Sequence, residues 1–275
     1  MTAIETTHPT RPVVGDPGLP LRLRWAIADT TTVLWRDTIR TLRQPEMLSF
    51  AVVMGSFFLI LFNYVFGGSI GAGAGIDYLQ FLVPGVLVIT ALNGAQQTSM
   101  GLAADMTEGV TDRFRSLPMS QVAVIAGRTL ADAGRNVVGL TLVVLISLLM
   151  GYRFASFAGA VGAVLLATGM GYAFSWMGAA IAAKVRQPDM VGMLSMFWLF
   201  PMMLASTAFA PAETMPGWLQ PLARYQPVSV TSDAVRGLAN GNLDTTDLLL
   251  SLAWIVGMLV VFVPLSMRLY TKADQ

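Results

Sequence analysis

The sequence has no cysteine and only one histidine, His8, among its 275 residues. No disulfide can form, and the cysteine and histidine ligands of ordinary zinc sites are missing, so we expect no bound metal. Charge is also scarce, because Asp, Glu, Lys and Arg together make up 12% of the chain. Soluble domains carry about 25%. This composition argues against an ordinary soluble protein.

The few charges are absent from six long segments of apolar residues. These are Met47–Ile76, Tyr78–Ala104, Asn136–Tyr152, Phe154–Ala183, Met190–Ala212 and Leu248–Met267. An apolar helix of about 20 residues crosses the hydrocarbon core of a bilayer. A charge at its centre costs about 2.5–3.5 kcal/mol, so six charge-free segments are not expected of a soluble core. The sequence predicts an all-α membrane protein with six transmembrane helices.

The basic residues indicate how these helices are oriented. Of the 17 Lys and Arg residues, only Arg153, Arg224 and Arg236 lie in the first, third and fifth connections. The others lie before the first span, in the second and fourth connections and in the tail. Lys and Arg gather on the cytoplasmic side. We therefore expect a multi-pass plasma-membrane protein with both termini in the cytoplasm.

The residues before the first span divide into two parts. Residues 1–20 contain four prolines and no apolar run, which is typical of a flexible cytoplasmic tail. Residues 21–46 alternate arginines with Leu, Ile and Trp, as in an amphipathic helix lying in the membrane interface. A solvated helix that leads into the membrane is the alternative. Residues 47–275 then form the six-span domain.

Two patterns inside the spans suggest roles. Asn93, Gln96 and Gln97 share one face of the second span by their spacing, and they would line a pathway or bond to a neighbouring helix. The fourth span has a small residue at every fourth position, which allows close helix packing within one subunit or between two. We define this small-residue stripe by Gly159, Ala163, Ala167 and Gly171.

Motifs for chemistry are missing from the chain. It has no GxxxxGK[ST] phosphate loop, no HExxH, and no Ser and His pair suited to hydrolysis. Residues 71–75 alternate Gly and Ala, but they follow a span and lack the third glycine of a dinucleotide loop. We expect no catalytic residues in this chain and an energy source elsewhere. A lipid-modifying enzyme is disfavoured because the loops have no clustered acid and base.

The most specific sequence motif lies between the second and third spans, in residues 105–120. Its central part reads Glu-Gly-Val-Thr-Asp-Arg-Phe-Arg-Ser-Leu-Pro-Met-Ser from Glu108 to Ser120, and a helix entering the third span follows from Gly127. This run resembles the coupling segment of permease subunits in type-2 ABC exporters, in the daunorubicin-resistance branch. The late motifs Met215–Pro221, Tyr225–Val228 and Ala234–Leu238 also resemble that family.

The resemblance implies a permease for hydrophobic or amphipathic cargo, such as a drug, an antibiotic or a lipid. Two such permease domains, identical or different, would surround one pathway, and separate ATP-binding subunits would bind ATP and Mg and dock beneath them. No cofactor is expected in this chain, and no nucleic acid is expected as a partner. The docking segment would form a cytoplasmic coupling helix. Its contact residues would be Glu108, Asp112, Arg113, Phe114, Arg115, Leu117 and Pro118, although many relatives have Glu where this chain has Asp112.

Residues 213–247 contain three prolines and apolar faces too short to span a bilayer. They predict an outer re-entrant helical segment between the fifth and sixth spans, serving as a lid above the pathway. A loop lying on the membrane surface is the alternative. For the whole chain, the rival to a permease is a non-transporting polytopic membrane protein that assists assembly or anchors a partner.

Overall fold

The computed structural model describes residues 53, 55–65, 67–68, 77–107 and 121–272. The predicted tail at 1–20, the interfacial helix at 21–46 and residues 108–120 of the coupling segment lie outside them. All regular structure in the described ranges is helical, as predicted. The labelled helices are α3 (Tyr78–Thr107), α5 (Gln121–Leu149), α6 (Phe157–Val185), α7 (Pro188–Leu204), η1 (Ala212–Thr214), α8 (Gln220–Tyr225), α9 (Pro227–Asn240) and α10 (Thr245–Lys272).

Four of these helices are long and apolar enough to cross a membrane: α3, α6, α5 from Arg128 onward, and α10 as far as Tyr270. They coincide with the second, fourth, third and sixth predicted spans. The other two predicted spans contain shorter apolar helices, Gly55–Val65 and α7. At about 1.5 Å per residue, the 17 residues of α7 cover about 25 Å. The described residues thus show four helices of spanning length.

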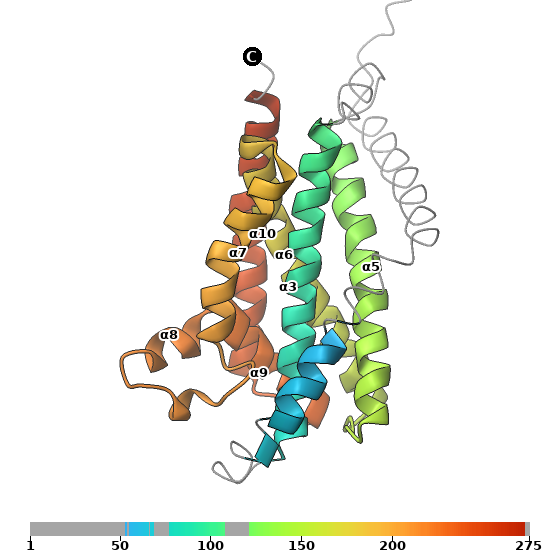
Figure 1. Ribbon diagram of the computed structural model, residues 1–275, viewed down its shortest axis with the longest axis vertical. Helices are drawn as coiled ribbons and strands as arrows, with labels where there is room; N and C mark the ends of the chain where they lie inside the picture. The colour runs from blue at the N-terminus through green and yellow to red at the C-terminus, as the bar shows by residue number, and fades with distance from the viewer. Residues whose placement is uncertain (1–52, 54, 66, 69–76, 108–120, 273–275) are drawn as a thin grey trace, which may run out of the picture.

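The long helices lie side by side and run alternately up and down the bundle (Figure 1). The chain turns between α5 and α6 at the same end where α3 begins and where α8 and α9 lie; we call this the Tyr78 end. At the opposite Thr107 end, α3 ends, α6 connects to α7, and α10 approaches the C-terminus. This alternation places residues from distant parts of the sequence at each end.

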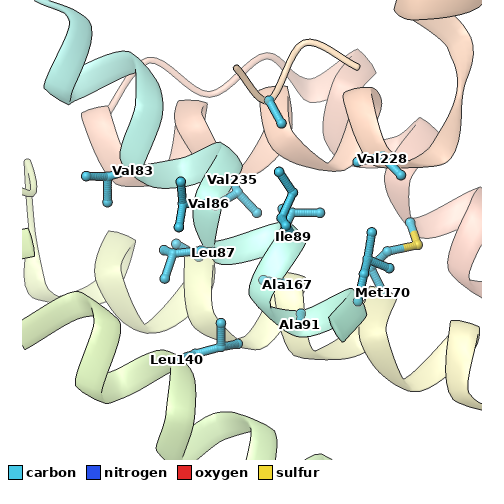
Figure 2. Close-up of a cluster of buried hydrophobic side chains, with 14 of the residues drawn as sticks. Val83, Val86, Leu87, Ile89, Ala91, Leu140, Ala167, Met170, Val228 and Val235 are labelled. Carbon is cyan, nitrogen blue, oxygen red and sulfur yellow. The ribbon is translucent and has the colours of Figure 1, made fainter. Parts of the chain in front are cut away.

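Helix α3 is the centre of the bundle. It contacts α5, α6, α7 and α9. In its most apolar 18-residue window 72% of the residues are buried, against 17% in that of α10. Figure 2 shows its side chains meeting those of the surrounding helices, and the labelled residues are Val83, Val86, Leu87, Ile89, Ala91, Leu140, Ala167, Met170, Val228 and Val235. α3 is therefore enclosed by its own chain, whereas α10 presents most of its surface outward.

Local signals explain where α6 begins and ends and where α7 begins. Ser156 caps the start of α6 by accepting a hydrogen bond from the backbone N of Gly159, at 3.0 Å. The helix ends at Arg186, which has a left-handed backbone with φ of 59°. Pro188 then begins α7, at a position where its missing N–H is not needed. The turn between the two helices is short, so they pack as antiparallel neighbours.

Candidate functional site

Asn93, Gln96 and Gln97 form what we call the amide face of α3. One of them makes a hydrogen bond to a neighbouring helix. Gln96 donates a hydrogen bond from Nε2 to the carbonyl oxygen of Gly192 in α7, at 3.1 Å. Asn93 and Gln97 are half-buried on the same face. The Gln96 bond fits the interhelical alternative, and it also places this face along the line where α3 and α7 meet. The three amides are therefore not enclosed in the core beside Leu87 and Ile89.

The small-residue stripe of α6 packs against helices of the same chain. A Cβ added at Gly171 would lie 2.7 Å from the carbonyl oxygen of Ala91 in α3, and one added at Gly159 would collide with the Leu238 carbonyl oxygen in α9. Ala163 and Ala167, between them, are both fully buried. The stripe thus brings α6 into close backbone contact with α3 and α9, which is the within-subunit arrangement.

A cluster of ion pairs joins α3 to α5 at the Thr107 end. Arg128 of α5 pairs with Asp105 near the end of α3, and its Nε lies 3.7 Å from Asp132 Oδ2. Arg135 Nη2 lies 2.8 Å from Asp132 Oδ1. The four side chains are between 8% and 19% exposed, so little water screens them. Asp105 lies three residues before the segment 108–120, which contains all seven predicted partner contacts, and Arg128 lies eight residues after it.

Sequence reasoning placed Arg128, Asp132 and Arg135 on one helix but did not identify a site there. Their spacing of four and three residues is the usual signal for ion pairs along a helix. The pair with Asp105 bridges two helices and has no such local signal. It could be found only after α3 and α5 were placed side by side.

A second polar cluster lies at the Tyr78 end, around Arg236 of α9. Arg236 pairs with Asp233 and donates from Nε to the Phe81 carbonyl oxygen, at 3.2 Å, and from Nη2 to the Thr207 carbonyl oxygen, at 3.0 Å. Its guanidinium also lies 3.8 Å from the centroid of the Phe81 ring. Thr207 Oγ1 donates to Asp233 Oδ2 at 3.0 Å. We call Arg236, Asp233, Thr207 and Phe81 the Arg236 cluster.

The end of α9 is held by a separate set of contacts. Asn240 accepts a hydrogen bond from the Tyr152 hydroxyl at 2.9 Å, and its Nδ2 donates to the Gln80 carbonyl oxygen at 3.5 Å. An ordinary tyrosine phenol is neutral at physiological pH, so its O–H group is available as a donor. Sequence reasoning identified none of these residues as a site.

The backbone approaches itself closely where α3 meets the segment after α7. A Cβ added at Gly85 would lie 2.7 Å from Ala208 Cα and closer still to its carbonyl oxygen. Tyr78, at the start of the same helix, donates from its hydroxyl to the Phe209 carbonyl oxygen at 3.0 Å. These contacts hold Ala208 and Phe209 against α3. Within the ranges that the structure describes, no group of three His, Cys, Asp or Glu residues could hold a metal ion.

Comparisons with known proteins find a matching family and similar permease proteins. Residues 28–239 match the family described as ABC-2 type transporter. The chain is 38% identical to the daunorubicin resistance ABC transporter permease protein DrrB1 of Streptomyces coeruleorubidus, over 98% of this chain and 97% of that protein. It is 26% identical to the probable doxorubicin resistance ABC transporter permease protein DrrC of Mycobacterium tuberculosis, over 94% of each. The putative transport permease ycf38 of Cyanophora paradoxa is 23% identical over 77% of this chain and 74% of its own length.

Proposed function

Because the chain belongs to the ABC-2 type transporter family, we propose that it is the permease subunit of an ATP-driven exporter. The observation that carries the proposal is the 38% identity to a daunorubicin resistance permease, which extends over 98% of the chain. The multi-pass helical bundle supports it, as does the resemblance of residues 105–120 to the coupling segment of such permeases. ATP hydrolysis is then the work of a separate ATP-binding subunit, which binds ATP and Mg²⁺, and this chain supplies the movement through the membrane.

The proposed topology has six spans, with both termini in the cytoplasm. The two ends of the bundle support it, because Arg153, Arg224 and Arg236 all lie at the Tyr78 end. Arg128, Lys184, Arg186 and Arg268 lie toward the Thr107 end. By the positive-inside rule the Thr107 end is cytoplasmic and the Tyr78 end is outside. Helices η1, α8 and α9 then form the outer re-entrant region.

The coupling step is proposed to act through residues 108–120. Phe114 and Leu117 would enter a groove of the ATP-binding subunit, with Asp112, Arg113 and Arg115 around them. Movement of this segment would reach α3 and α5 through the ion pairs of Asp105, Arg128, Asp132 and Arg135. Because these ion pairs are mostly buried, they would hold the two helices together as the partner subunit closes.

The pathway is proposed to run along the amide face of α3, between two permease subunits. Asn93, Gln96 and Gln97 would supply hydrogen bonds in an otherwise apolar surrounding, which suits hydrophobic or amphipathic cargo. The names of two relatives, with daunorubicin and doxorubicin resistance, support drugs of that class as cargo. Transport then needs two packings of the permease pair whose balance shifts with the nucleotide state of the partner.

Efflux from cells tests this function. The chain and its ATP-binding partner would be expressed in cells loaded with daunorubicin, beside a control in which the phosphate-loop Lys of the partner is replaced by Ala. We expect rapid loss of the drug from cells with the active pair and retention in the control. Equal retention in both would favour a membrane protein that assists assembly or anchors a partner.

A further inference from the structure

Helix α9 is bound to two other parts of the chain by one side chain. Arg236 reaches the carbonyl oxygen and ring of Phe81 in α3 and the carbonyl oxygen of Thr207, in the segment that follows α7. Its charge is balanced by Asp233 on its own helix. A guanidinium has five N–H donors in a fixed planar arrangement, so one Arg can satisfy all these acceptors together.

Further contacts follow α9 along its length. Near its start, Gln226 donates to the Ala205 carbonyl oxygen at 2.6 Å, and Ser229 Oγ accepts from the Thr207 backbone N at 3.0 Å. In its middle, the hydroxyl of Thr231 lies 3.0 Å from that of Ser251 in α10. Asn240 holds its end, as described above. These contacts join α9 to α3, to α10 and to residues 205–207.

A lid that swings away would have to break these contacts. Arg236 is only 15% exposed, so opening would break its ion pair with Asp233 and its hydrogen bonds to the Phe81 and Thr207 carbonyl oxygens together. The side of α9 that packs on the bundle is also buried, including Val228, Val235 and Ala239. A helix held in this way is suited to a fixed position and not to a hinge.

We propose that α9 is a fixed wedge at the outer end of the bundle and that Arg236 is the positioning residue that sets it. The wedge holds the outer end of α3 and the segment after α7 at a constant spacing while the chain transports. The lid expected from the sequence would then be a fixed cover of the pathway and not a moving one. The inference rests on the proposed function, because transport is the activity that the positioning serves.

A cross-link between α9 and α10 tests whether α9 moves. Thr231→Cys with Ser251→Cys would place two thiols where two hydroxyls now lie 3.0 Å apart, and the chain has no other cysteine. Oxidation should form the disulfide and leave ATP-dependent daunorubicin efflux within twofold of the reduced form. A tenfold loss that a reductant reverses would show that α9 must move. Failure of the disulfide to form would contradict the packing of α9 on α10.

Removal of the Arg236 charge pair tests the positioning role. Asp233→Asn with Arg236→Gln removes both charges together, so no unpaired charge is left inside the bundle. We expect normal membrane levels and partner binding, with efflux lowered at least tenfold. The control is Glu213→Gln with Arg224→Gln, which removes an ion pair at the same end with side chains 69% and 53% exposed. Its efflux should stay within twofold of wild type.

Two further results complete the test. Arg236→Lys keeps the charge but loses the planar fork, so the protein level should stay normal and only part of the wild-type efflux should be kept. Efflux within twofold of wild type in the Asn and Gln double variant would overturn the positioning role. If the wild-type pair shows no ATP-dependent efflux, the proposed function fails and this inference fails with it. A difference confined to the variants concerns the wedge alone.

Discussion

Gln96 of α3 donates a hydrogen bond from its side-chain amide to the carbonyl oxygen of Gly192 in α7, at 3.1 Å. It is a side-chain contact between the predicted second and fifth spans, on the face that also carries Asn93 and Gln97. Gln96 lies well inside α3, and Gly192 lies in the first part of α7. Its removal therefore tests whether this face serves packing or transport.

Replacing this amide separates the two roles. Interhelical hydrogen bonds in membranes average about 0.6 kcal/mol, so Gln96→Leu should leave the chain folded and bound to its partner. If the face lines the pathway, both Gln96→Leu and Gln97→Leu should change which amphipathic compounds stimulate ATP hydrolysis, while basal hydrolysis is kept. An unchanged compound profile in both variants would assign the face to packing.

The close approach of α3 to Ala208 predicts a strong effect of one methyl group. Gly85→Ala would force backbone atoms apart, and overpacking of this kind costs about 1–3 kcal/mol. We expect a lower midpoint of thermal unfolding in detergent. The matched control is Gly257→Ala in α10, where an added Cβ meets nothing within 4 Å. A control as unstable as Gly85→Ala would contradict the packing described for α3.

The ion pairs at the Thr107 end predict different effects for two arginines of α5. Arg128 pairs with Asp105 on α3 as well as with its own helix, whereas the pair of Arg135 with Asp132 lies within α5. Arg128→Gln should therefore lower efflux per ATP hydrolysed several-fold, with a smaller effect from Arg135→Gln. The measurement is the ratio of the two rates in membranes that contain the complete complex. Equal ratios in the two variants would show that the bridge to α3 carries no coupling.

The coupling segment gives a prediction from its sequence. Truncation of a buried apolar anchor can cost roughly 2 kcal/mol, about a thirtyfold loss of affinity. Phe114→Ala should thus release the ATP-binding subunit or separate its hydrolysis from efflux, while the chain stays in the membrane. Arg115→Ala should have a milder effect, because charges at a rim are screened. Normal co-purification and normal efflux in Phe114→Ala would refute the coupling role.

Membrane sidedness can be measured because the chain has no native cysteine. Gly217 lies in open space at the Tyr78 end, and Gln187 is exposed at the Thr107 end. In intact cells an impermeant thiol reagent should label Gly217→Cys and not Gln187→Cys. After the cells are permeabilised, both should be labelled. The reverse pattern in intact cells would invert the proposed topology.

The sequence predicted the helices best where one physical rule decides the outcome. A charge-free apolar segment has few choices in a bilayer, and α3, α6 and α10 lie where those segments are. The rule worked less well at the end of the fifth predicted span. That segment is apolar as far as Ala212, yet α7 ends at Leu204. The residues that follow bond instead to Gln226 and Ser229, which no local pattern predicts.

The same limit applies to the two polar clusters. In the sequence, Arg236 counted as a loop charge and as part of the Ala234–Leu238 motif, with no contact assigned to it, but it contacts Phe81, which lies 155 residues earlier. Asn93, Gln96 and Gln97 were identified because polar residues in an apolar helix are unusual. Arg236 and Asp233 lie among other polar residues, so nothing marks them until the helices are packed. Long-range contacts of this kind depend on the complete fold.

Reconstitution of the purified complex in lipid vesicles tests most directly whether this chain is the permease of an ATP-driven exporter. Vesicles that contain this chain and its ATP-binding subunit, with the nucleotide sites facing outward, should take up daunorubicin when ATP and Mg²⁺ are added. Vesicles with either protein alone, or with a partner whose phosphate-loop Lys is replaced by Ala, should not. If the complete complex hydrolyses ATP without moving daunorubicin, a hydrophobic cation or a labelled phospholipid, the chain is not the permease of an exporter for amphipathic cargo.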